Sequence, residues 1–432
     1  MSDELFPDID RQDAAAPASD APVRYETANR TQVELTPTDL EALLPPGHAA
    51  RLVWRFVEGL DLSAFYVGIK ARVDGPGRSP IDPQVLLALW LYATIDGVGS
   101  ARAVVRLTEA HDAYRWLRGG VSLNYHTLSD FRTAHPTALT DLLTQAIATL
   151  RHRGIVTLAR VAQDGTRIRA SAGVGSFRRE GTLRACLQEA QTLVERTQRQ
   201  GEGGLTREAA AQARAAAERL TRVEEALAAL PEVAAAKARN RSTGEAKVST
   251  TDPDARIMKL ADGGFRPAYN VQFATDQASD VILGVAVTTV GSDQQQLVPM
   301  LDQLAARDCV PETVVVDGGY VAYDAIDTTA ARGITLIMPV PCRRGTADPV
   351  PLQPTDSPAV GAWRHRMQTD AAKQLYRMRG ATAERLNADL RTHRTLTQLS
   401  LRGVQKVHTW VLWLALAHNL MRAMAIVPHL MT

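Results

Sequence analysis

The chain has 432 residues, of which 45% are hydrophobic and 22% are charged, and its formal net charge is +2. This composition is ordinary for a globular protein with room for two or three domains. The three cysteines are far apart, and the sequence has neither a CxxC pair nor a Cys/His quartet. A structural zinc site and a disulfide framework are therefore not expected.

Residues 1–34 are rich in Ala, Pro, Asp and Ser without periodicity, which predicts a disordered tail. Residues 35–150 carry helical signals. In IDPQVLLALWLYATIDG, we expect Asp82 as the N-cap, Pro83 at the first helical position and Gly97 just beyond the helix end. Ser100 is expected to begin another helix. Short helices with many arginines predict a helix-turn-helix-like DNA-binding domain, and a plain helical bundle is the alternative.

Strand signals begin near Arg153. The segment TLARVAQDGTRIRASAG (157–173) predicts a strand, a turn at Asp164–Gly165 and a second strand. Residues 176–248 are rich in Ala, Arg and Glu, and they predict a long helical pair inserted into a sheet domain that spans 151–430. A coiled-coil contact between this pair and another subunit is one use that its composition allows.

Four later segments predict strands: AYNVQFATD, VILGVAVTTV, TVVVDGGY and ITLIMPV. Between the second and third of these, SDQQQLVPMLDQLAARD predicts a helix capped by Ser292, and another helix is expected around 322–331. A Pro/Gly-rich loop over 341–362 precedes a helix from about 369 to 394. The expected fold class is α/β, a mixed sheet flanked by helices.

The apolar segment 410–427 contains His418, Asn419 and Arg422, so we expect a buried core helix there rather than a membrane span. The N-terminus lacks the basic-then-apolar order of a signal peptide, and a cytoplasmic location is expected. The stretch 364–408 contains ten Lys/Arg against three Asp/Glu, a local excess of seven positive charges. This density favours a polyanionic partner, with a solvated helix face as the alternative.

Two acids follow apolar strand residues and precede glycine, namely Asp164 and Asp317. Ligands gather at strand ends in open α/β sheets, and glycine lets a ligand approach the backbone. Two carboxylates placed together repel unless cations neutralise them, and Mg²⁺ prefers such oxygen ligands. Glu384, on the helix predicted near 369–394, is the candidate third acid, with a salt-bridge partner as the alternative. Three such acids fit two-metal phosphoryl transfer, in which water or a DNA 3′-hydroxyl attacks a phosphodiester.

From about residue 36 the chain resembles the DDE transposases of bacterial insertion sequences. The likeness rests on the order of several motifs, each of them weak alone. They are PIDPQVLLALWLYATIDGVGSARAVVRLTEAHDAYRWLRGG with HTLSDFR, DPDARIMKLADGGFRPAYNVQFATD, WRHRMQTDAAKQLYRMRGATAER and LALAHNLMR. The resemblance implies a helical N-terminal transposase domain and a catalytic domain like that of ribonuclease H.

By this resemblance, the catalytic and metal-binding triad is Asp164, Asp317 and Glu384. Many members carry a Tyr–Arg–Glu–Lys pattern around the glutamate, which here corresponds to Tyr376, Arg379, Glu384 and Arg391. The chain departs from the pattern twice, because four residues separate Arg379 from Glu384 and because arginine replaces the lysine. Arginine binds phosphate as a planar fork rather than as a point charge. Asp389 has no counterpart in the pattern and is the poorer third acid.

The resemblance further implies Mg²⁺ as cofactor with Mn²⁺ as a substitute, double-stranded DNA as partner, a homodimer or larger active complex, and a nucleoid-associated location. Arg167 is a candidate phosphate contact, and Trp363 is a candidate for stacking on a base, with core packing as its alternative. The expected function is cleavage and strand transfer of an insertion sequence after binding of its terminal inverted repeats. The alternatives are a metal-dependent nuclease of the same fold and a non-catalytic DNA-binding descendant.

Overall fold

The computed structural model describes residues 31, 39–71, 79–201, 206–239, 243–342, 351–394 and 396–426. The predicted tail at 1–34 lies outside the described residues, apart from Thr31. All described helices and strands belong to one compact unit, Leu40–Thr432.

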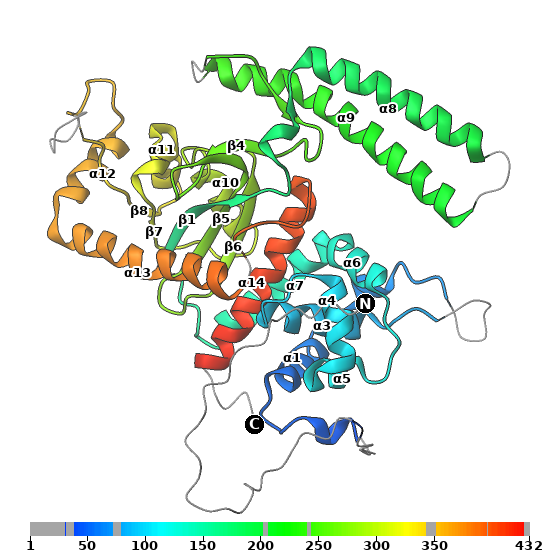
Figure 1. Cartoon of the computed structure of the whole chain (residues 1–432). Coiled ribbons are helices and arrows are strands. Elements are labelled where there is room, and N and C mark those ends of the chain that lie inside the picture. Colours follow the sequence, from blue (N-terminus) through cyan, green and yellow to red (C-terminus); the bar gives the residue numbers. More distant parts are fainter. Residues whose placement is uncertain are drawn as a thin grey trace, which may run out of the picture. The chain divides into compact units, whose positions relative to one another are not determined.

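The front of this unit is helical (Figure 1). Its elements are η1 (Glu41–Leu43), α1 (Ala49–Glu58), α2 (Ser63–Tyr66), α3 (Pro83–Ile95), α4 (Ala101–Ala110), α5 (Asp112–Arg118), α6 (Tyr125–Ala134) and α7 (Pro136–His152).

The start and stop signals predicted for α3 are confirmed. The Asp82 carboxylate accepts a hydrogen bond from the Gln84 amide, Pro83 is the first helical residue, and Gly97 has a φ of +73° just past the end. Ser100 caps α4 by accepting from the Ala103 amide. Side-chain oxygens at these positions satisfy amides that the helix itself leaves unpaired.

The sheet is mixed. Its elements are β1 (Arg160–Arg169), β4 (Arg256–Lys259), β5 (Phe265–Asp276), β6 (Ile282–Thr288), β7 (Thr313–Val315) and β8 (Thr335–Ile337), while β2 (Phe177–Arg178) and β3 (Val248–Ser249) form a separate pair. The strand order is β4-β5-β1-β7-β8, and β6 also pairs with β5. The neighbours β1 and β5 are antiparallel, whereas β1, β7 and β8 run parallel to one another.

The expected turn at Asp164–Gly165 is wrong. A single strand, β1, runs through both residues, and it stays paired with β5 from Val161 to Arg169. The glycine here therefore serves a purpose other than reversing the chain.

The remaining helices cover or extend the sheet. They are η2 (Val174–Ser176), α8 (Glu180–Gly201), α9 (Arg207–Arg239), α10 (Leu297–Ala305), η3 (Gly318–Tyr320), α11 (Tyr323–Ala331), α12 (Pro358–Gln368), α13 (Asp370–His393) and α14 (Val404–Ile426). The expected loop over 341–362 is shorter than predicted, because α12 begins at Pro358 with Ser357 as its cap. Helix α10 begins at Leu297, four residues later than the predicted helix.

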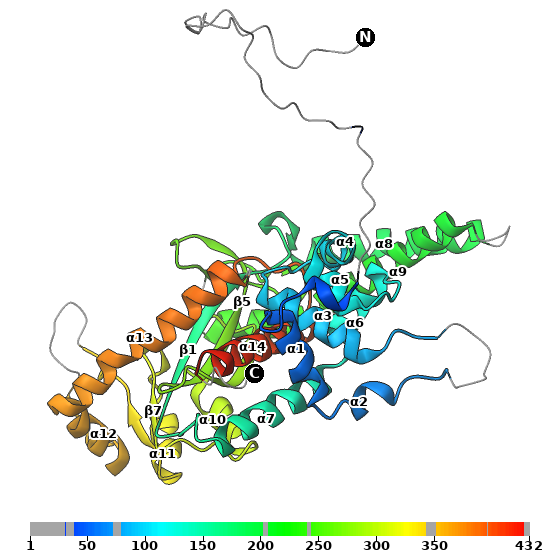
Figure 2. The same cartoon turned by 90° about the horizontal axis from the view of Figure 1, so that it is seen from below.

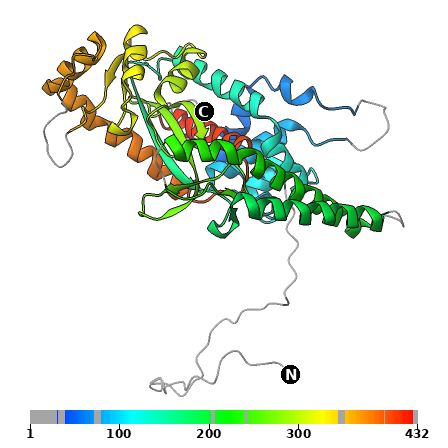
Figure 3. The same ribbon diagram turned by 90° about the horizontal axis from the view of Figure 1, so that it is seen from above.

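The helical pair predicted for 176–248 is present as α8 and α9, which lie side by side as a long hairpin between β1 and β5 in the sequence (Figure 3). A small cluster of Leu183, Ala226, Leu230 and Val248 holds the hairpin to β3. The hairpin thus interrupts the sheet in sequence without entering it.

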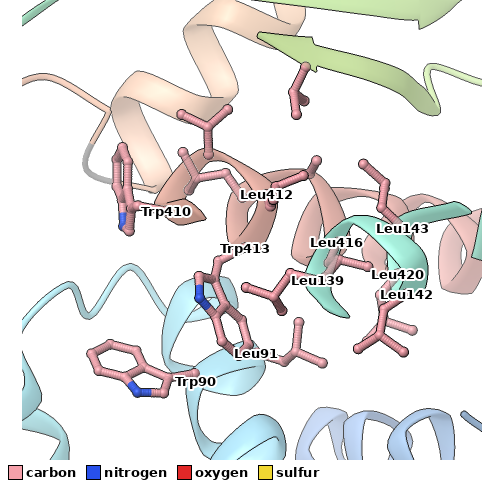
Figure 4. Packing of buried hydrophobic residues seen from close by; sticks show 14 of the residues in the cluster. Trp90, Leu91, Leu139, Leu142, Leu143, Trp410, Leu412, Trp413, Leu416 and Leu420 are labelled. Carbon is pink, nitrogen blue, oxygen red and sulfur yellow. The ribbon is translucent and has the colours of Figure 1, made fainter. Parts of the chain in front are cut away.

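Helix α14 is the centre of the largest hydrophobic cluster (Figure 4). Its Trp413 and Leu416 lie among side chains of α3 and α7, including Trp90 and Leu139, and α14 also packs on β6. The cluster thus joins the front helices to the sheet across the predicted boundary near residue 150. The segment 410–427 is confirmed as a core helix for its described part. Among the described residues, no helix is both long and apolar enough to span a membrane.

Helix α13 crosses one face of the sheet and contacts β1, β7 and β8 (Figures 1 and 2). Ala372 on this helix packs against Val315 and Ile337 of the parallel strands. The opposite side of the same strands, with Val314 and Leu336, packs against α10 and α11. The basic helix therefore lies directly over the strands that carry or precede the two candidate acids.

Candidate active site

Asp164 and Asp317 lie at the same level of two neighbouring parallel strands. Ala162 of β1 is paired with Val315 of β7, and each acid follows two residues later. Paired residues of adjacent strands are about 5 Å apart, and residues two apart share a face. The register therefore brings the two predicted acids together on the side covered by α13. Strand β7 ends at Val315 while β1 continues, so the acids lie where the sheet narrows.

Helix α13 supplies two polar contacts to Asp164. Arg379 Nη1 lies 3.3 Å from Asp164 Oδ1, and Asn387 Nδ2 donates to Asp164 Oδ2 over 2.9 Å. Both oxygens of this carboxylate thus face the basic helix. The Asp164 side chain is 18% exposed, so these contacts form in a partly desolvated place.

The electrostatics of the site are those of crowded carboxylates. Burial raises the pKa of Asp164 to about 6; Arg379 opposes this shift, and the negative charge of Asp317 adds to it. Burial alone would lower the pKa of Arg379, but the charges of Asp164 and Asp317 outweigh it and raise that pKa. These mutual effects show that the three groups form one electrostatic unit.

Two further residues of the signature helix lie in this region. The Arg379 guanidinium stands 5.8 Å from the Tyr376 ring centroid, a distance typical of a cation–π contact. Arg391 Nη2 donates to the Thr166 hydroxyl of β1. Tyr376, Arg379 and Arg391 are thus brought to the same face of the sheet as Asp164.

Glu384 lies on α13 between Arg379 and Asn387, but its side chain is exposed to solvent. It is three residues before Asn387, and residues three apart on a helix are neighbours on its surface. The glutamate is therefore next to the group that contacts Asp164. The rival acid, Asp389, lies 3.7 Å from Arg394 and 3.6 Å from His418, in a network at α14.

A fourth acid, which the sequence did not single out, lies next to β1 at Gly165. Asp293 follows β6, and its Oδ1 accepts hydrogen bonds of 2.7 Å from both Asn270 Nδ2 and Gln272 Nε2 of β5. A Cβ atom at Gly165 would collide with this carboxylate oxygen and with the Gln272 amide. Because Gly165 has no side chain, the Asp293 carboxylate can lie close to the backbone of β1.

The sequence contains one signal for this network and a separate one for Asn387. Asn270 and Gln272 are polar residues two apart inside an otherwise apolar strand, and both are fully buried. Buried amides need hydrogen-bond partners, and a nearby acid is one of the strongest acceptors. Asn387, which donates to Asp164, lies three residues after Glu384. Its spacing places it next to Glu384 on the surface of α13.

Two predicted DNA contacts lie elsewhere. Arg167 faces the Asp293 side of β1, where its guanidinium donates to the Gly291 carbonyl over 2.8 Å, and its side chain is 36% exposed. Trp363 is 1% exposed, and its indole N–H donates to the Met338 carbonyl. The structure thus places Trp363 in the core, as its packing alternative has it, and not on a surface where a base could stack.

The donor chemistry of the site fits a divalent cation in part. Asp164 and Asp317 offer hard oxygen ligands. Burial is the main cause of the raised pKa of Asp164, and the charge of Asp317, which a cation would neutralise, adds to it. Within the described ranges, however, no three His, Cys, Asp or Glu side chains are grouped closely enough to hold a metal ion. The side chain of Glu384, the third predicted ligand, is exposed.

A hollow of about 860 Å³ lies between the end of β8, α12 and the start of α13. Its lining includes Tyr376 and four basic side chains: Arg364, His365, Lys373 and Arg377. Pro339, Leu352 and Met367 contribute apolar surface. Among the described residues that line this hollow none is acidic, so its surface suits a negatively charged partner.

Comparison with known protein families gives two matches. Residues 245–420, from β3 into α14, match a family described as a transposase DDE domain. Residues 38–134, the front helices up to α6, match a transposase domain family known as DUF772. A search of curated proteins and a search of solved structures each returned no match.

The two matches identify a transposase, and its structure has a helical front and an α/β domain. The chain belongs to the DDE transposases, as found in insertion sequences. The match to the DDE domain begins after β1, so Asp164 is assigned by the strand register and not by that match.

Proposed function

We propose that this transposase cleaves DNA at the ends of an insertion sequence and joins the freed 3′ ends to target DNA. Asp164, Asp317 and Glu384 are its catalytic acids. The observation that carries the proposal is the β1–β7 register, which sets Asp164 level with Asp317 beneath a helix that bears Glu384. The sheet order, with one antiparallel neighbour and two parallel strands beside β1, supports a catalytic domain like that of ribonuclease H.

The three acids would hold Mg²⁺ or Mn²⁺, which supplies charge neutralisation at the scissile phosphodiester and activation of the attacking oxygen. Arg379 and Asn387 keep the Asp164 carboxylate oriented toward α13. Arg391, already at β1, is placed to bind a phosphate oxygen through its planar guanidinium. The low exposure of Asp164 keeps bulk water from screening these charges.

Double-stranded DNA is the proposed partner. The basic hollow beside Tyr376 and the excess of positive charge over 364–408 support a path for the phosphate backbone toward the acids. The arginines of α4 and α5 support binding of the terminal repeats by the front helices. A homodimer or larger assembly would hold two transposon ends together for joining.

The test is an assay with a plasmid that carries a pair of matching transposon ends and a second plasmid as target, in the presence of Mg²⁺. We expect wild-type protein to yield cut ends and joined products. Asp164→Asn and Asp317→Asn should abolish both while retaining binding to the ends in a gel-shift titration. Normal cleavage by either variant would refute the assignment of the acids.

The alternative function is a metal-dependent nuclease of the same fold. The same assay separates the two functions, because a nuclease would give nicks and breaks without joined products.

A further inference from the structure

The network around Asp293 lies outside the predicted triad, yet it comes close to Asp317, and the charge of Asp293 acts on Asp164. A Cβ atom at Gly319 would lie 2.9 Å from Asp317 Oδ1 and 3.7 Å from Asp293 Oδ2. The two carboxylates thus lie within 4 Å of one point beside the loop that follows β7. The charge of Asp293 also contributes to the raised pKa of Asp164, after burial and the charge of Asp317.

The Asp293 carboxylate sets the orientation of the Gln272 amide. Because a carboxylate only accepts hydrogen bonds, the NH₂ group of Gln272 must face it, and the amide oxygen must point away. That oxygen accepts from the Tyr320 hydroxyl and, over 3.2 Å, from Gln163 Nε2. Gln272 is fully buried, so a misoriented amide would leave polar atoms unpaired.

Tyr320 links this amide to the second acid. It is the last residue of η3, the turn that Asp317 caps by accepting from the Gly319 amide over 2.7 Å. Tyr320 is fully buried, so its ring anchors this turn in the hydrophobic core. A continuous hydrogen-bonded chain therefore runs from Asp293 through Gln272 and Tyr320 to the loop that carries Asp317.

Asp293 also restrains a candidate DNA contact. Its Oδ2 lies 3.6 Å from Arg167 Nη2, and the same guanidinium is bonded to the carbonyl of Gly291, two residues before Asp293. Its carboxylate is 14% exposed and has cationic or amide partners on both oxygens. These contacts hold the Asp293 carboxylate between the amides of β5 and the Arg167 guanidinium of β1.

We propose that Asp293 is a positioning residue of the active site, which holds the Asp317 loop through the Gln272–Tyr320 chain and holds Arg167 at the edge of β1. This inference rests on the proposed function for its catalytic meaning. Its structural part, the coupling of Asp293 to Tyr320 through Gln272, can be measured independently of catalysis.

The test uses Asp293→Ala, which removes the acceptor of the Gln272 amide, together with Tyr320→Phe and the double variant, and Asp302→Ala is the control. Asp302 is an acid of α10 that pairs with Arg332 on the surface, away from this chain of hydrogen bonds. We expect each single substitution in the chain to lower the cleavage kcat at least about tenfold while end affinity changes less than about threefold. The double variant should be no slower than the slower single variant, because both substitutions break one chain. The control should cleave like wild type.

Melting temperatures of the same proteins supply the second readout. The double variant should show the drop of the more affected single variant and not the sum of both drops. Wild-type cleavage by Asp293→Ala, or effects that multiply in kcat and add in melting temperature, would overturn the inference. If wild-type protein itself does not cleave DNA, the proposed function fails, and the melting temperatures alone still decide whether Asp293 and Tyr320 act as one unit.

Discussion

At the scale of single residues, α13 carries two candidates for the third catalytic acid. Glu384 is exposed beside Asn387, whereas Asp389 is held by Arg394 and His418. We expect Glu384→Gln to abolish cleavage with an unchanged melting temperature. Asp389→Asn should retain cleavage and melt at a lower temperature. The reverse pattern in the plasmid assay would move the third catalytic role to Asp389.

The pH dependence of stability distinguishes Asp389 further. The hydrogen bond from His418 lowers the pKa of Asp389, burial opposes this, and the charge of Arg394 adds to the lowering. A carboxyl group with a lowered pKa stabilises the fold above its unfolded pKa of about 4, and this stabilisation is lost as the pH falls through the folded pKa. The difference in melting temperature between wild type and Asp389→Asn should therefore be present at pH 7 and shrink below pH about 4. A difference that stays constant down to pH 3 would contradict this account.

Gly165 is a second residue with a sharp expectation. A methyl group there would meet the Gln272 amide and the Asp293 carboxylate, both held by buried hydrogen bonds. Gly165→Ala should lower the free energy of unfolding by about 1–3 kcal/mol, the usual cost of overpacking. Gly361→Ala is the matched control, because a Cβ atom at Gly361 on α12 would meet nothing within 4 Å. Equal stability of the two variants in chemical denaturation would refute the close approach.

Although Asp164 lies inside β1 and not at its end, the sequence singled out Asp164 and Asp317 as candidates because glycine follows each of them. It could not locate Asp293, since SDQQQLVPML has the pattern of a helix start, while the helix begins only at Leu297. Gly165 was misread for a related reason. A glycine after an acid signals a turn locally, but its cause here is the carboxylate of a residue 128 positions later.

At the scale of elements, the DPDAR motif that contributed to the family resemblance receives a physical explanation. Asp254 Oδ2 accepts from the Val404 amide over 2.9 Å, and Asp252 Oδ1 accepts from the Gly403 amide over 3.1 Å. Both amides lie at the start of α14, where they have no partner within the helix. A loop before β4 therefore caps the helix at the centre of the largest core.

We expect Asp254→Ala to lower the free energy of unfolding by about 1 kcal/mol, the usual value of a helix cap. Asp254→Asn should recover most of the loss because its amide oxygen still accepts the Val404 hydrogen bond. Chemical denaturation of the three proteins measures both effects. Identical stability of Asp254→Ala and wild type would show that this contact contributes nothing to α14.

Elements with strong local signals were predicted well, and those defined by distant partners were not. The caps of α3 and α4, the α8–α9 pair and α13 follow from spacing and composition along a few turns. The pairing of β1 with both β5 and β7 joins segments about 100 and 150 residues apart, and no local pattern encodes such a register. The position of α13 over β1, which defines the site, depends on that register.

At the scale of the whole molecule, the net charge of +2 conceals a strongly basic stretch at 364–408. DNA that binds there displaces counterions, so the affinity for transposon ends should fall at least about tenfold between 50 and 200 mM salt. A gel-shift titration at several salt concentrations measures the slope. Substitution of both Lys373 and Arg377 by Gln should reduce it, whereas a flat response in wild type would argue against this surface as the DNA path.

The position of α14 in the core of the front helices has a consequence for biosynthesis. Trp90 and Leu139 lie 323 and 274 residues before Trp413, the side chain that completes their packing, and so emerge from the ribosome long before it. A nascent chain therefore carries an unfinished front until α14 (Val404–Ile426) has been translated. Prematurely terminated products would lack α14, which completes the core, and proteases would cleave them. They should therefore not accumulate as truncated competitors for the transposon ends.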